Sequence, residues 1–511
     1  MKLNNTLLKK YFSDLFLLSV FLYMALRIYV DAYLNDTMMT PDSCGYLREA
    51  LNLIEGNGFR CDKIAGYDTW FSSWPIMYPF LIMLMTFTTK TSAYLASKLV
   101  NILVIGIILL LFRQRYKENA WIYSICLLNL GFITIARYTW SECTFILFLF
   151  AFTAIFSRII SAEQVGVKYY IGLGVMGICT FLTRYFGMYI WFVVGIYLLF
   201  LLVKFIRQRE KPVLHKFVAL TITAMVSGVL EIAYFAMNKR MSGMISGVDR
   251  GISPNEDYFK LTEGLAESLL TEVFHVFGIQ ISPLMVNIFY VFQFIIFLAI
   301  ILYLGKFMKK YSERMLSAQV FCVTGIVYYV VFIIFRYFSS MDPFGYRFFE
   351  PATFIICVGV LEVVVSKFNM KEGYWYFGGC MLLIIISAGI SICMYGFEEG
   401  ENSYKANDVK YESAYSEVPK RSVVILRDSS EYDYWLLYYR PDIMQYSVTA
   451  CSSKDEIYNR FGKSDHICIP LDLADEMLDS NVCCDDLKAW IESEIQEENG
   501  QKFVVLDIAQ D

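Results

Sequence analysis

"TPDSCGYLREALNLIEGNGF", residues 40–59, predicts a polar helix directly after a long apolar run. That run, about residues 12–32, has the length that crosses a bilayer, which takes about 20 apolar residues. Apolar side chains then recur at helical spacing in "GYLREALNLIEG", and Gly56 and Gly58 mark the end of this second helix. The sequence therefore predicts a chain that leaves a membrane and folds at its surface.

The composition of the whole chain agrees with a membrane protein. Of its 511 residues, 57% are hydrophobic and 18% are charged, whereas soluble proteins carry about 25% charged residues. Residues 396–511 contain 11 Lys and Arg against 25 Asp and Glu, while the remainder contains 33 against 24. We therefore predict a membrane module over 1–395, an acidic domain over 396–511, and a lipid bilayer rather than nucleic acid as the surroundings.

Apolar runs predict a mainly α, polytopic bundle of about 11 spans. The expected spans are about 12–32, 93–112, 119–136, 142–159, 169–183, 186–206, 215–237, 283–305, 316–337, 349–366 and 374–395. Residues 72–87 are short for a span and carry prolines near their start, so we predict an interfacial or re-entrant helix there.

Basic residues predict the orientation. If the N-terminus is cytoplasmic, the basic connections at 2–10, 113–117, 207–216, 305–314 and 366–372 all face the cytoplasm. The first span follows basic residues with no small-residue cleavage site after it, so we expect it to stay uncleaved. The outside segments are then 33–92, 137–141, 184–185, 238–282, 338–348 and the C-terminal tail. An extra crossing at 76–91 would reverse this pattern, and we reject it.

The C-terminal tail alternates between two patterns. Strands are predicted by β-branched runs at 422–428, 443–449, 465–471 and 502–508. Helical spacing with acidic starts occurs between them, at 430–440, 453–461 and 484–495. This alternation predicts a small extracytoplasmic α/β domain. No Gly-rich phosphate loop follows its strands, so we expect a structural or acceptor-positioning role.

Charged residues gather at the outside ends of the predicted spans, where their cost favours a functional role. They are Asp31, Asp36 and Asp42 with Tyr46; Arg137 and Glu142; Arg184 with Tyr185; and Asp342, Tyr346, Arg347 and Glu350. Arginines bind phosphate oxygens bidentately, and a carboxylate acts as general base on a hydroxyl. We therefore predict a site for an anionic, lipid-linked substrate, with Asp42 and Glu142 as catalytic residues. The predicted substrate-binding residues are Tyr46, Arg137, Arg184, Tyr185, Asp342, Tyr346 and Arg347.

Each of these residues also has a structural interpretation. Asp42 could cap the helix that begins near Gly45, and Asp31 and Asp36 are interpreted as solvated loop charges. Glu142 could form an ordinary ion pair with Arg137. Arg184 could extend to the headgroups, and Arg347 could pack on Tyr346 and Phe348 through cation–π contacts.

Histidine and cysteine limit the metal and redox chemistry. Only three histidines are present, which argues against a multi-histidine metal site. The 13 cysteines include no CxxC pair, and those inside apolar runs are interpreted as small core residues. Cys44 and Cys61 lie in one polar segment and could pair in an oxidising compartment.

The order of motifs resembles the GT-C glycosyltransferases, in the bacterial branch related to protein O-mannosyltransferases and lipid A aminoarabinose transferases. The matching features are Asp42, Tyr46, the helix that ends in Gly-x-Gly, and "WPIMYP" (74–79). Ser141-Glu142, Arg184-Tyr185 and "YRFFEP" (346–351) follow in the same order. The resemblance covers roughly residues 12–395.

The resemblance implies a transferase that takes a sugar from a polyprenyl-phosphate donor to a lipid, glycan or protein acceptor. Asp42 would deprotonate the acceptor hydroxyl at the outer face of the plasma membrane, with inversion, while arginines hold the leaving phosphate. Many relatives have an Asp-Glu doublet where this chain has Asp42-Ser43, so a divalent metal is not favoured and no cofactor is predicted. The alternatives are a flippase or transporter of polyisoprenoid-linked glycans, or a non-catalytic cell-envelope assembly protein.

Overall fold

The computed structural model describes residues 5–34, 37–62, 69–246, 256–276, 315–340, 344–367, 404–427, 433–447, 453–461, 464–479, 484–495 and 502–507. The chain forms two compact units. The first contains Met1–Asp31, Ser72–Tyr78 and Lys98–Glu398, and the second contains Ala32–Phe71, Pro79–Ser97 and Glu399–Asp511. The predicted spans 283–305 and 374–395, together with Asp36 and Asp342, lie outside the described residues.

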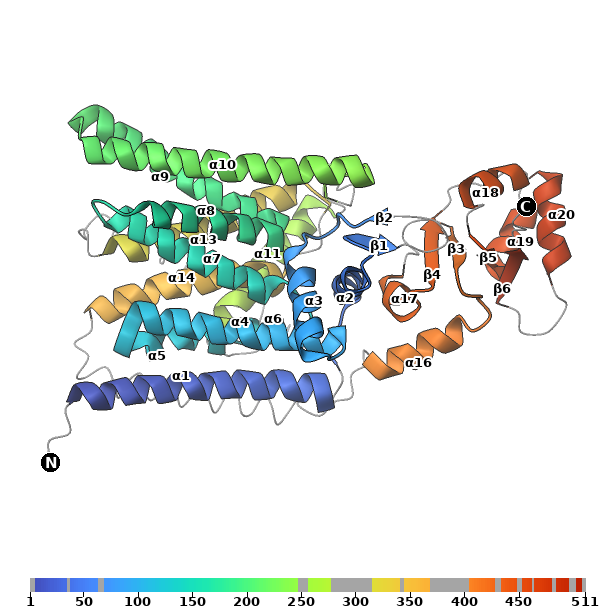
Figure 1. The fold of residues 1–511 in the computed structure, drawn as a ribbon, viewed down its shortest axis with the longest axis horizontal. Helices are drawn as coiled ribbons and strands as arrows, with labels where there is room; N and C mark the ends of the chain where they lie inside the picture. The colour runs from blue at the N-terminus through green and yellow to red at the C-terminus, as the bar shows by residue number, and fades with distance from the viewer. Residues whose placement is uncertain are drawn as a thin grey trace. The chain divides into compact units, whose positions relative to one another are not determined.

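The first unit is a helical bundle. Its described helices begin with α1 (Asn5–Tyr29), α4 (Ala93–Tyr116), α5 (Ala120–Tyr123), α6 (Leu130–Arg137), α7 (Glu142–Ser161) and α8 (Val167–Thr183). They continue with α9 (Ile190–Gln208), α10 (Lys211–Ser242), α11 (Tyr258–Val276), α13 (Leu316–Tyr337) and α14 (Tyr346–Lys367). The long helices run side by side (Figure 1), with α13 packed against α14 and α7, and α10 packed against α8 and α9.

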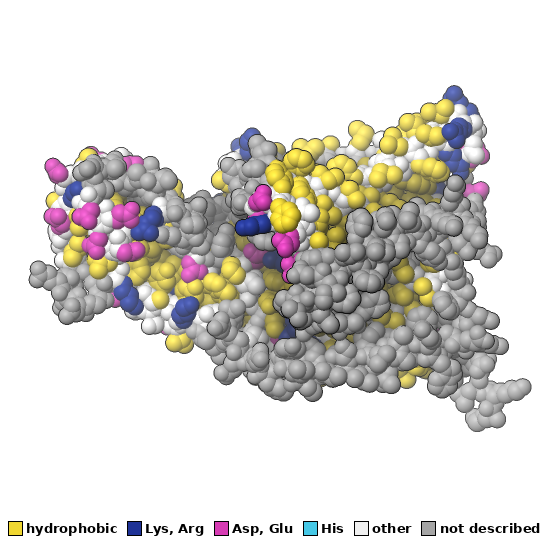
Figure 2. All heavy atoms as spheres, turned by 180° about the vertical axis from the view of Figure 1, so that it is seen from behind, with side chains coloured by type: hydrophobic (Ala, Val, Ile, Leu, Met, Phe, Trp, Pro, Cys, Tyr) yellow, Lys and Arg dark blue, Asp and Glu magenta, His cyan; other side chains and the backbone are white. Residues whose placement is uncertain are grey.

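Seven described segments are long and apolar enough to cross a membrane. They are Tyr11–Tyr33, Ala93–Leu128, Glu142–Ser161, Tyr185–Gln208, Lys211–Ser242, Leu316–Tyr337 and Tyr346–Ser366. In Figure 2, hydrophobic side chains, in yellow, cover much of the coloured part of the bundle surface. On α10 the exposed ones include Ile222, Met225, Val229 and Ile232. The prediction of a mainly α, multi-pass membrane protein is therefore confirmed.

Two apolar helices are too short for that group. They are α3 (Met77–Thr89) and α8 (Val167–Thr183). The 13 residues of α3 extend over about 20 Å, less than the apolar thickness of a bilayer. Its length fits the predicted interfacial or re-entrant helix.

The predicted single helix over 119–136 was wrong. The chain instead forms α5, a 3-10 helix η3 (Ser124–Leu128) and then α6. Asn129 lies between η3 and α6 in an extended conformation, and its side-chain oxygen accepts a hydrogen bond of 2.9 Å from the amide of Phe132. An N-cap of this kind starts a new helix, and it overrides the apolar run in which Asn129 lies.

The second unit contains a four-stranded sheet. Its strands are β3 (Ser422–Leu426), β4 (Ile443–Ser447), β5 (His466–Pro470) and β6 (Phe503–Asp507), in the order β4-β3-β5-β6. β3 is parallel to β4 and β5, while β6 is antiparallel to β5. All four strands fall in the predicted runs. Every residue of β3 is buried, as expected for a central strand with both faces covered.

The sheet carries helices that build its core. They are α17 (Tyr434–Tyr439), α18 (Lys454–Phe461), α19 (Leu471–Asp479) and α20 (Asp485–Glu494). α17, α18 and α20 were predicted. Val423, Ile467 and Val504 from the sheet pack with Leu487 and Ile491 of α20.

The second unit also contains part of the first polar loop. α2 (Pro41–Ile54) is followed by the two-stranded ribbon of β1 (Arg60–Asp62) and β2 (Thr69–Trp70). Gly56 and Gly58 adopt positive φ angles of 77° and 78°, where a Cβ would be strained. They follow the end of α2, as the sequence predicted. In this unit, α2 packs against α17, and α17 packs against α16 (Tyr404–Ala414).

Candidate functional site

The connection between α6 and α7, residues 138–141, organises the charged groups of the first unit. Arg137 ends α6 and Glu142 begins α7. Between them, the rings of Tyr138 and Trp140 stack with their centroids 4.1 Å apart. A short, rigid connection thus holds a guanidinium and a carboxylate at the same end of two successive helices.

Arg137 is paired with Asp31 from the end of the first span. One guanidinium nitrogen donates to Asp31 Oδ1 at 3.0 Å, and Nε donates to Oδ2. Arg27 Nε lies 3.6 Å from the same carboxylate, whose residue is 1% exposed. The interpretation of Asp31 as a solvated loop charge was therefore wrong. A buried carboxylate needs a paired charge to offset its desolvation, and two arginines supply it.

The end of α6 is held by polar side chains of α4. Lys98 Nζ donates to the carbonyl of Arg137 at 2.7 Å. The Asn101 amide donates to the carbonyls of Ala136 and Tyr138, each at 2.9 Å. These bonds satisfy carbonyls that a helix end leaves without a partner. Lys98 and Asn101 were missed as site residues. Their signal was a lysine and an asparagine inside the apolar run 93–112, where polar groups are costly.

Glu142 is paired with two arginines that come from distant parts of the chain. Arg184, which follows α8, and Arg347, in the first turn of α14, both form ion pairs with Glu142 Oε1. Glu142 is fully buried, whereas Arg184 and Arg347 remain 18% and 16% exposed. The alternative pairing of Glu142 with Arg137 was wrong, since Arg137 binds Asp31.

Aromatic rings fix the two guanidinium groups. Arg347 lies over the Trp140 ring at 4.3 Å from its centroid, and Arg184 lies over Phe348 at 5.6 Å. Cation–π contacts of this kind hold an arginine without using its N–H donors. Gly187 permits the turn after Arg184, because a Cβ there would lie 2.6 Å from the Thr180 carbonyl carbon.

The two predicted tyrosines of the first unit lie in different surroundings. The Tyr185 hydroxyl donates to the carbonyl of Ser72 at 2.8 Å and accepts from the Asn238 amide at 2.8 Å. It therefore ties the start of residues 72–78 to α10. Tyr346 begins α14 next to Arg347 and is half-buried.

Asp42 and Tyr46 lie on α2, in the second unit. The cap of this helix is formed by Thr40 and Ser43: the Thr40 amide donates to Ser43 Oγ at 3.0 Å, and their hydroxyls are 3.2 Å apart. Asp42 occupies the first turn and is partly exposed. The cap is thus built by the residues on either side of Asp42. Tyr46, one turn further, is buried.

The surroundings of α2 are apolar and tightly packed. Cys44 is a buried free thiol whose pKa is raised, first by burial and then by the Asp433 and Asp42 carboxylates. Asp433 accepts a hydrogen bond of 2.6 Å from the Tyr411 hydroxyl. Tyr439 stacks on Tyr411 with centroids 5.6 Å apart. Residues of α16 and α17 therefore form the environment of the helix that carries Asp42.

Metal ligands are not gathered in the part of the chain that the structure describes. No group of three His, Cys, Asp or Glu side chains there comes close enough to hold an ion. Asp31 and Glu142 each form an ion pair with arginine: Asp31 with Arg137, and Glu142 with Arg184.

The fold is similar to that of solved structures of ArnT and of an archaeal oligosaccharyltransferase. ArnT from Cupriavidus metallidurans bound to undecaprenyl phosphate aligns with a TM-score of 0.53 and 11% identity over 96% of this chain and 98% of its own. The apo form of the same protein aligns with a TM-score of 0.54 and 12% identity, over 90% of this chain and 94% of its own. A third structure is the oligosaccharyltransferase AglB from Archaeoglobus fulgidus, in complex with an inhibitory peptide and a dolichol-phosphate. It aligns with a TM-score of 0.50 and 12% identity, over 90% of this chain and 70% of its own.

Sequence comparison gives no corresponding match. No protein-family model matches the chain, and no curated protein does. The likeness therefore lies in the arrangement of helices, at sequence identities where only the fold is retained.

Proposed function

We propose that this protein is an integral-membrane glycosyltransferase that moves a sugar from a polyprenyl-phosphate donor to an acceptor at the extracytoplasmic face. The observation that carries the proposal is the cluster at the start of α7, where Arg184 and Arg347 converge on the single buried carboxylate of Glu142. Both guanidiniums stay partly exposed. The fold supports it, because one protein with this fold binds undecaprenyl phosphate.

In the proposed site, Glu142 positions the two arginines and they bind the donor phosphate. Guanidinium groups hold phosphate oxygens through paired N–H donors. A buried carboxylate that pairs with both arginines fixes their separation before the donor arrives, so less ordering is needed on binding. Arg137, held by Asp31, adds positive charge at the same end of α6 and α7. Glu142 thereby acts on the donor through the arginines.

Asp42 is the proposed general base. Its carboxylate takes the proton of the acceptor hydroxyl, whose oxygen forms a bond to the anomeric carbon of the sugar. The bond from that carbon to the phosphate oxygen breaks, and the electron pair leaves with the polyprenyl phosphate. Attack opposite the leaving group inverts the anomeric centre. The arginines stabilise the charge that gathers on the phosphate.

The remaining assignments complete the proposal. Tyr46, Tyr185, Asp342 and Tyr346 are the other substrate-binding residues in this proposal. The loops 33–92 and 238–282 and the domain at 396–511 face the outside of the plasma membrane. The acceptor is a lipid, a glycan or a protein.

The Asp42→Asn variant tests the base. Asn keeps the size of the side chain but cannot take a proton, and general bases contribute about 10²–10⁴-fold to a rate. We expect normal insertion and protein level, with loss of the transferred sugar from cell-envelope glycans measured by mass spectrometry against a deletion strain. Glu55→Gln is the matched control, since Glu55 is an exposed acid just beyond α2. Transfer by Asp42→Asn at the wild-type level removes the base assignment.

The Arg347→Ala variant tests the phosphate site separately. It removes one of the two guanidiniums that pair with Glu142, and a lost charge-assisted bond costs about 1.5–3 kcal/mol. We expect the apparent affinity for the polyprenyl-phosphate donor to fall about tenfold or more in membranes. Arg209→Ala, which removes an exposed arginine after α9, is the control. Unchanged donor dependence would contradict the role of Arg347.

A further inference from the structure

A cavity of about 500 Å³ lies at the other end of the bundle from Glu142. It is lined by the last turns of α4, α7 and α14 and by the first turn of α13. Ser157 on its wall is 15 residues after Glu142 in α7, and Glu362 is 15 residues after Arg347 in α14. At 1.5 Å per helical residue, each separation is about 22 Å. This cavity is therefore distinct from the arginine cluster.

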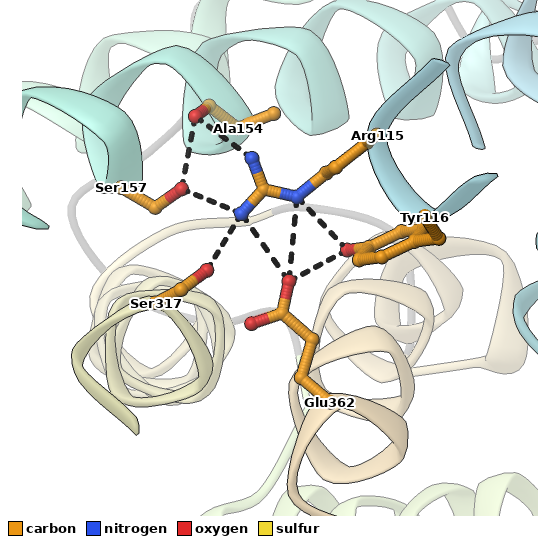
Figure 3. A network of polar contacts seen from close by, with 6 residues as sticks. All are labelled: Arg115, Tyr116, Ala154, Ser157, Ser317 and Glu362. Carbon is orange, nitrogen blue, oxygen red and sulfur yellow. Dashed lines mark hydrogen bonds and ion pairs between the residues drawn. The ribbon is translucent and has the colours of Figure 1, made fainter. Parts of the chain in front are cut away.

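Arg115 lies in the lining of the cavity, and Figure 3 shows its polar contacts. Its Nη2 donates to Ser157 Oγ at 2.9 Å, to Ser317 Oγ at 2.6 Å and to Glu362 Oε1 at 3.2 Å. The Tyr116 hydroxyl donates to the same Glu362 oxygen at 2.7 Å. These bonds join α4, α7, α13 and α14, so the wall is fixed before any ligand enters.

Arg158 gives the cavity an excess of positive charge. The charges of Arg115 and Glu362 compensate each other in their ion pair. Arg158, on α7, is exposed, and no acidic side chain pairs with it among the residues that the structure describes. The described lining thus carries two guanidiniums and one carboxylate, and it favours an anion.

The other lining groups suit a phosphate attached to something apolar. Ser161 and Ser366 supply hydroxyls, and α13 begins at the cavity without a side-chain cap on its first amides. Met315, Ala318 and Val365 add an apolar side. A free phosphate would leave the apolar side of the cavity exposed to water. The glycerol and first methylenes of a lipid would instead cover it.

We propose that this cavity binds the phosphate of an anionic phospholipid headgroup, held by Arg158 and the neighbouring hydroxyls. By the distribution of basic residues, this end of the bundle is the cytoplasmic one, where the leaflet is anionic and basic pockets between helices attract lipid headgroups. The site does not depend on sugar transfer at the opposite end of the helices.

The experiment titrates the delipidated full-length protein with single lipids and counts bound lipid by native mass spectrometry. Phosphatidylglycerol, phosphatidylethanolamine, diacylglycerol and inorganic phosphate are the four probes. Arg158→Gln removes the charge and Arg158→Lys keeps it. Arg207→Gln is the matched control, because Arg207 is an exposed arginine in the last turn of α9, outside the lining. Thermal unfolding of each variant checks that it folds, since Arg158 also stabilises the end of α7.

We expect phosphatidylglycerol to bind more tightly than diacylglycerol, and Arg158→Gln to weaken that binding about tenfold. Arg158→Lys and Arg207→Gln should retain most of it. Equal binding of diacylglycerol to the wild type overturns the proposal without any variant. Saturable binding of inorganic phosphate with no lipid preference overturns the lipid assignment, and equal losses in Arg158→Gln and Arg207→Gln overturn the site.

Discussion

Glu49 shows how a single residue of α2 couples the stability of this helix to pH. Its side chain is fully buried, and neither carboxyl oxygen has a hydrogen-bond partner among the described residues. Burial raises its pKa well above the ordinary value, because the charged form loses its hydration. Glu49 lies seven residues after Asp42 and therefore on the same face of the helix.

We expect the folded protein to lose stability as pH rises above about 4.3, the pKa of glutamate in an unfolded chain. Below that pH both states bind the proton. Above it the unfolded state releases the proton first, so the free energy of unfolding falls by about 1.4 kcal/mol per pH unit until the folded group also ionises. In Glu49→Gln this part of the pH dependence should vanish. Denaturant unfolding in detergent from pH 5 to 8 measures it, and identical slopes for variant and wild type would contradict it.

The partners of the charged residues were harder to predict than their presence. The positions of Asp31, Arg137, Glu142, Arg184 and Arg347 stood out in the sequence because charges at span ends are costly. Their pairing joins residues 106 and 205 positions apart, in Arg137 with Asp31 and Arg347 with Glu142. Only the packing of helices fixes such pairs, and so the alternative of a local ion pair between Glu142 and Arg137 was wrong. The role of Ser43 was also missed. It stands where the resembling family has the Glu of an Asp-Glu doublet, and here its hydroxyl accepts a hydrogen bond from the Thr40 amide at the start of α2.

At the scale of elements, α2 is held by the C-terminal part of the chain. The Tyr439 hydroxyl lies 3.9 Å from the Met39 sulfur, just before α2, and its ring stacks on Tyr411 of α16. Cys44, on α2, is close enough to Asp433 for that carboxylate to raise its pKa. We therefore infer that the tail helps to position the helix that carries the proposed base, which is a structural role of the kind expected from its sequence.

Truncation of Tyr439 tests this support. Removing a buried aromatic side chain costs about 3–5 kcal/mol, and in Tyr439→Ala the loss falls where α17 meets α2. We expect sugar transfer to fall while the helical bundle stays folded. Tyr458→Ala is the matched control, because Tyr458 stacks on Trp490 within the tail at 5.5 Å. Equal transfer by the two variants would argue against positioning by α17, and limited proteolysis would report whether each tail stays folded.

Elements were predicted well where one pattern governs them. The strands of the tail are short β-branched runs, and each formed where the pattern placed it. The segment 119–136 has two competing signals, an apolar run and the polar Asn129 within it, and the polar residue determined the break. Helix α19 and helix α16 were not predicted.

At the scale of the whole molecule, orientation decides which chemistry each end of the bundle can meet. The arginine cluster at the start of α7 and the cavity at its end are separated by the length of a span, so they face opposite sides of a membrane. Basic connections such as the one between α9 and α10 predict that the cavity lies on the cytoplasmic side. Figure 2 shows Lys and Arg side chains gathered at one end of the bundle. Arg207, Arg209 and Lys211, at the end of α9 and the start of α10, are exposed.

Cysteine labelling in intact cells measures this orientation directly. Glu210→Cys lies between α9 and α10 and Asp472→Cys lies on α19, and both positions are exposed. We expect an impermeant maleimide to label Asp472→Cys in intact cells and Glu210→Cys only after permeabilisation, each above the signal of the 13 native cysteines in the unsubstituted protein. The reason is that moving the basic connections across the membrane is unfavourable, so they stay in the cytoplasm. Labelling of Glu210→Cys in intact cells would show that the bundle has the opposite orientation in the membrane. It would place the arginine cluster on the cytoplasmic side and refute sugar transfer at the outer face.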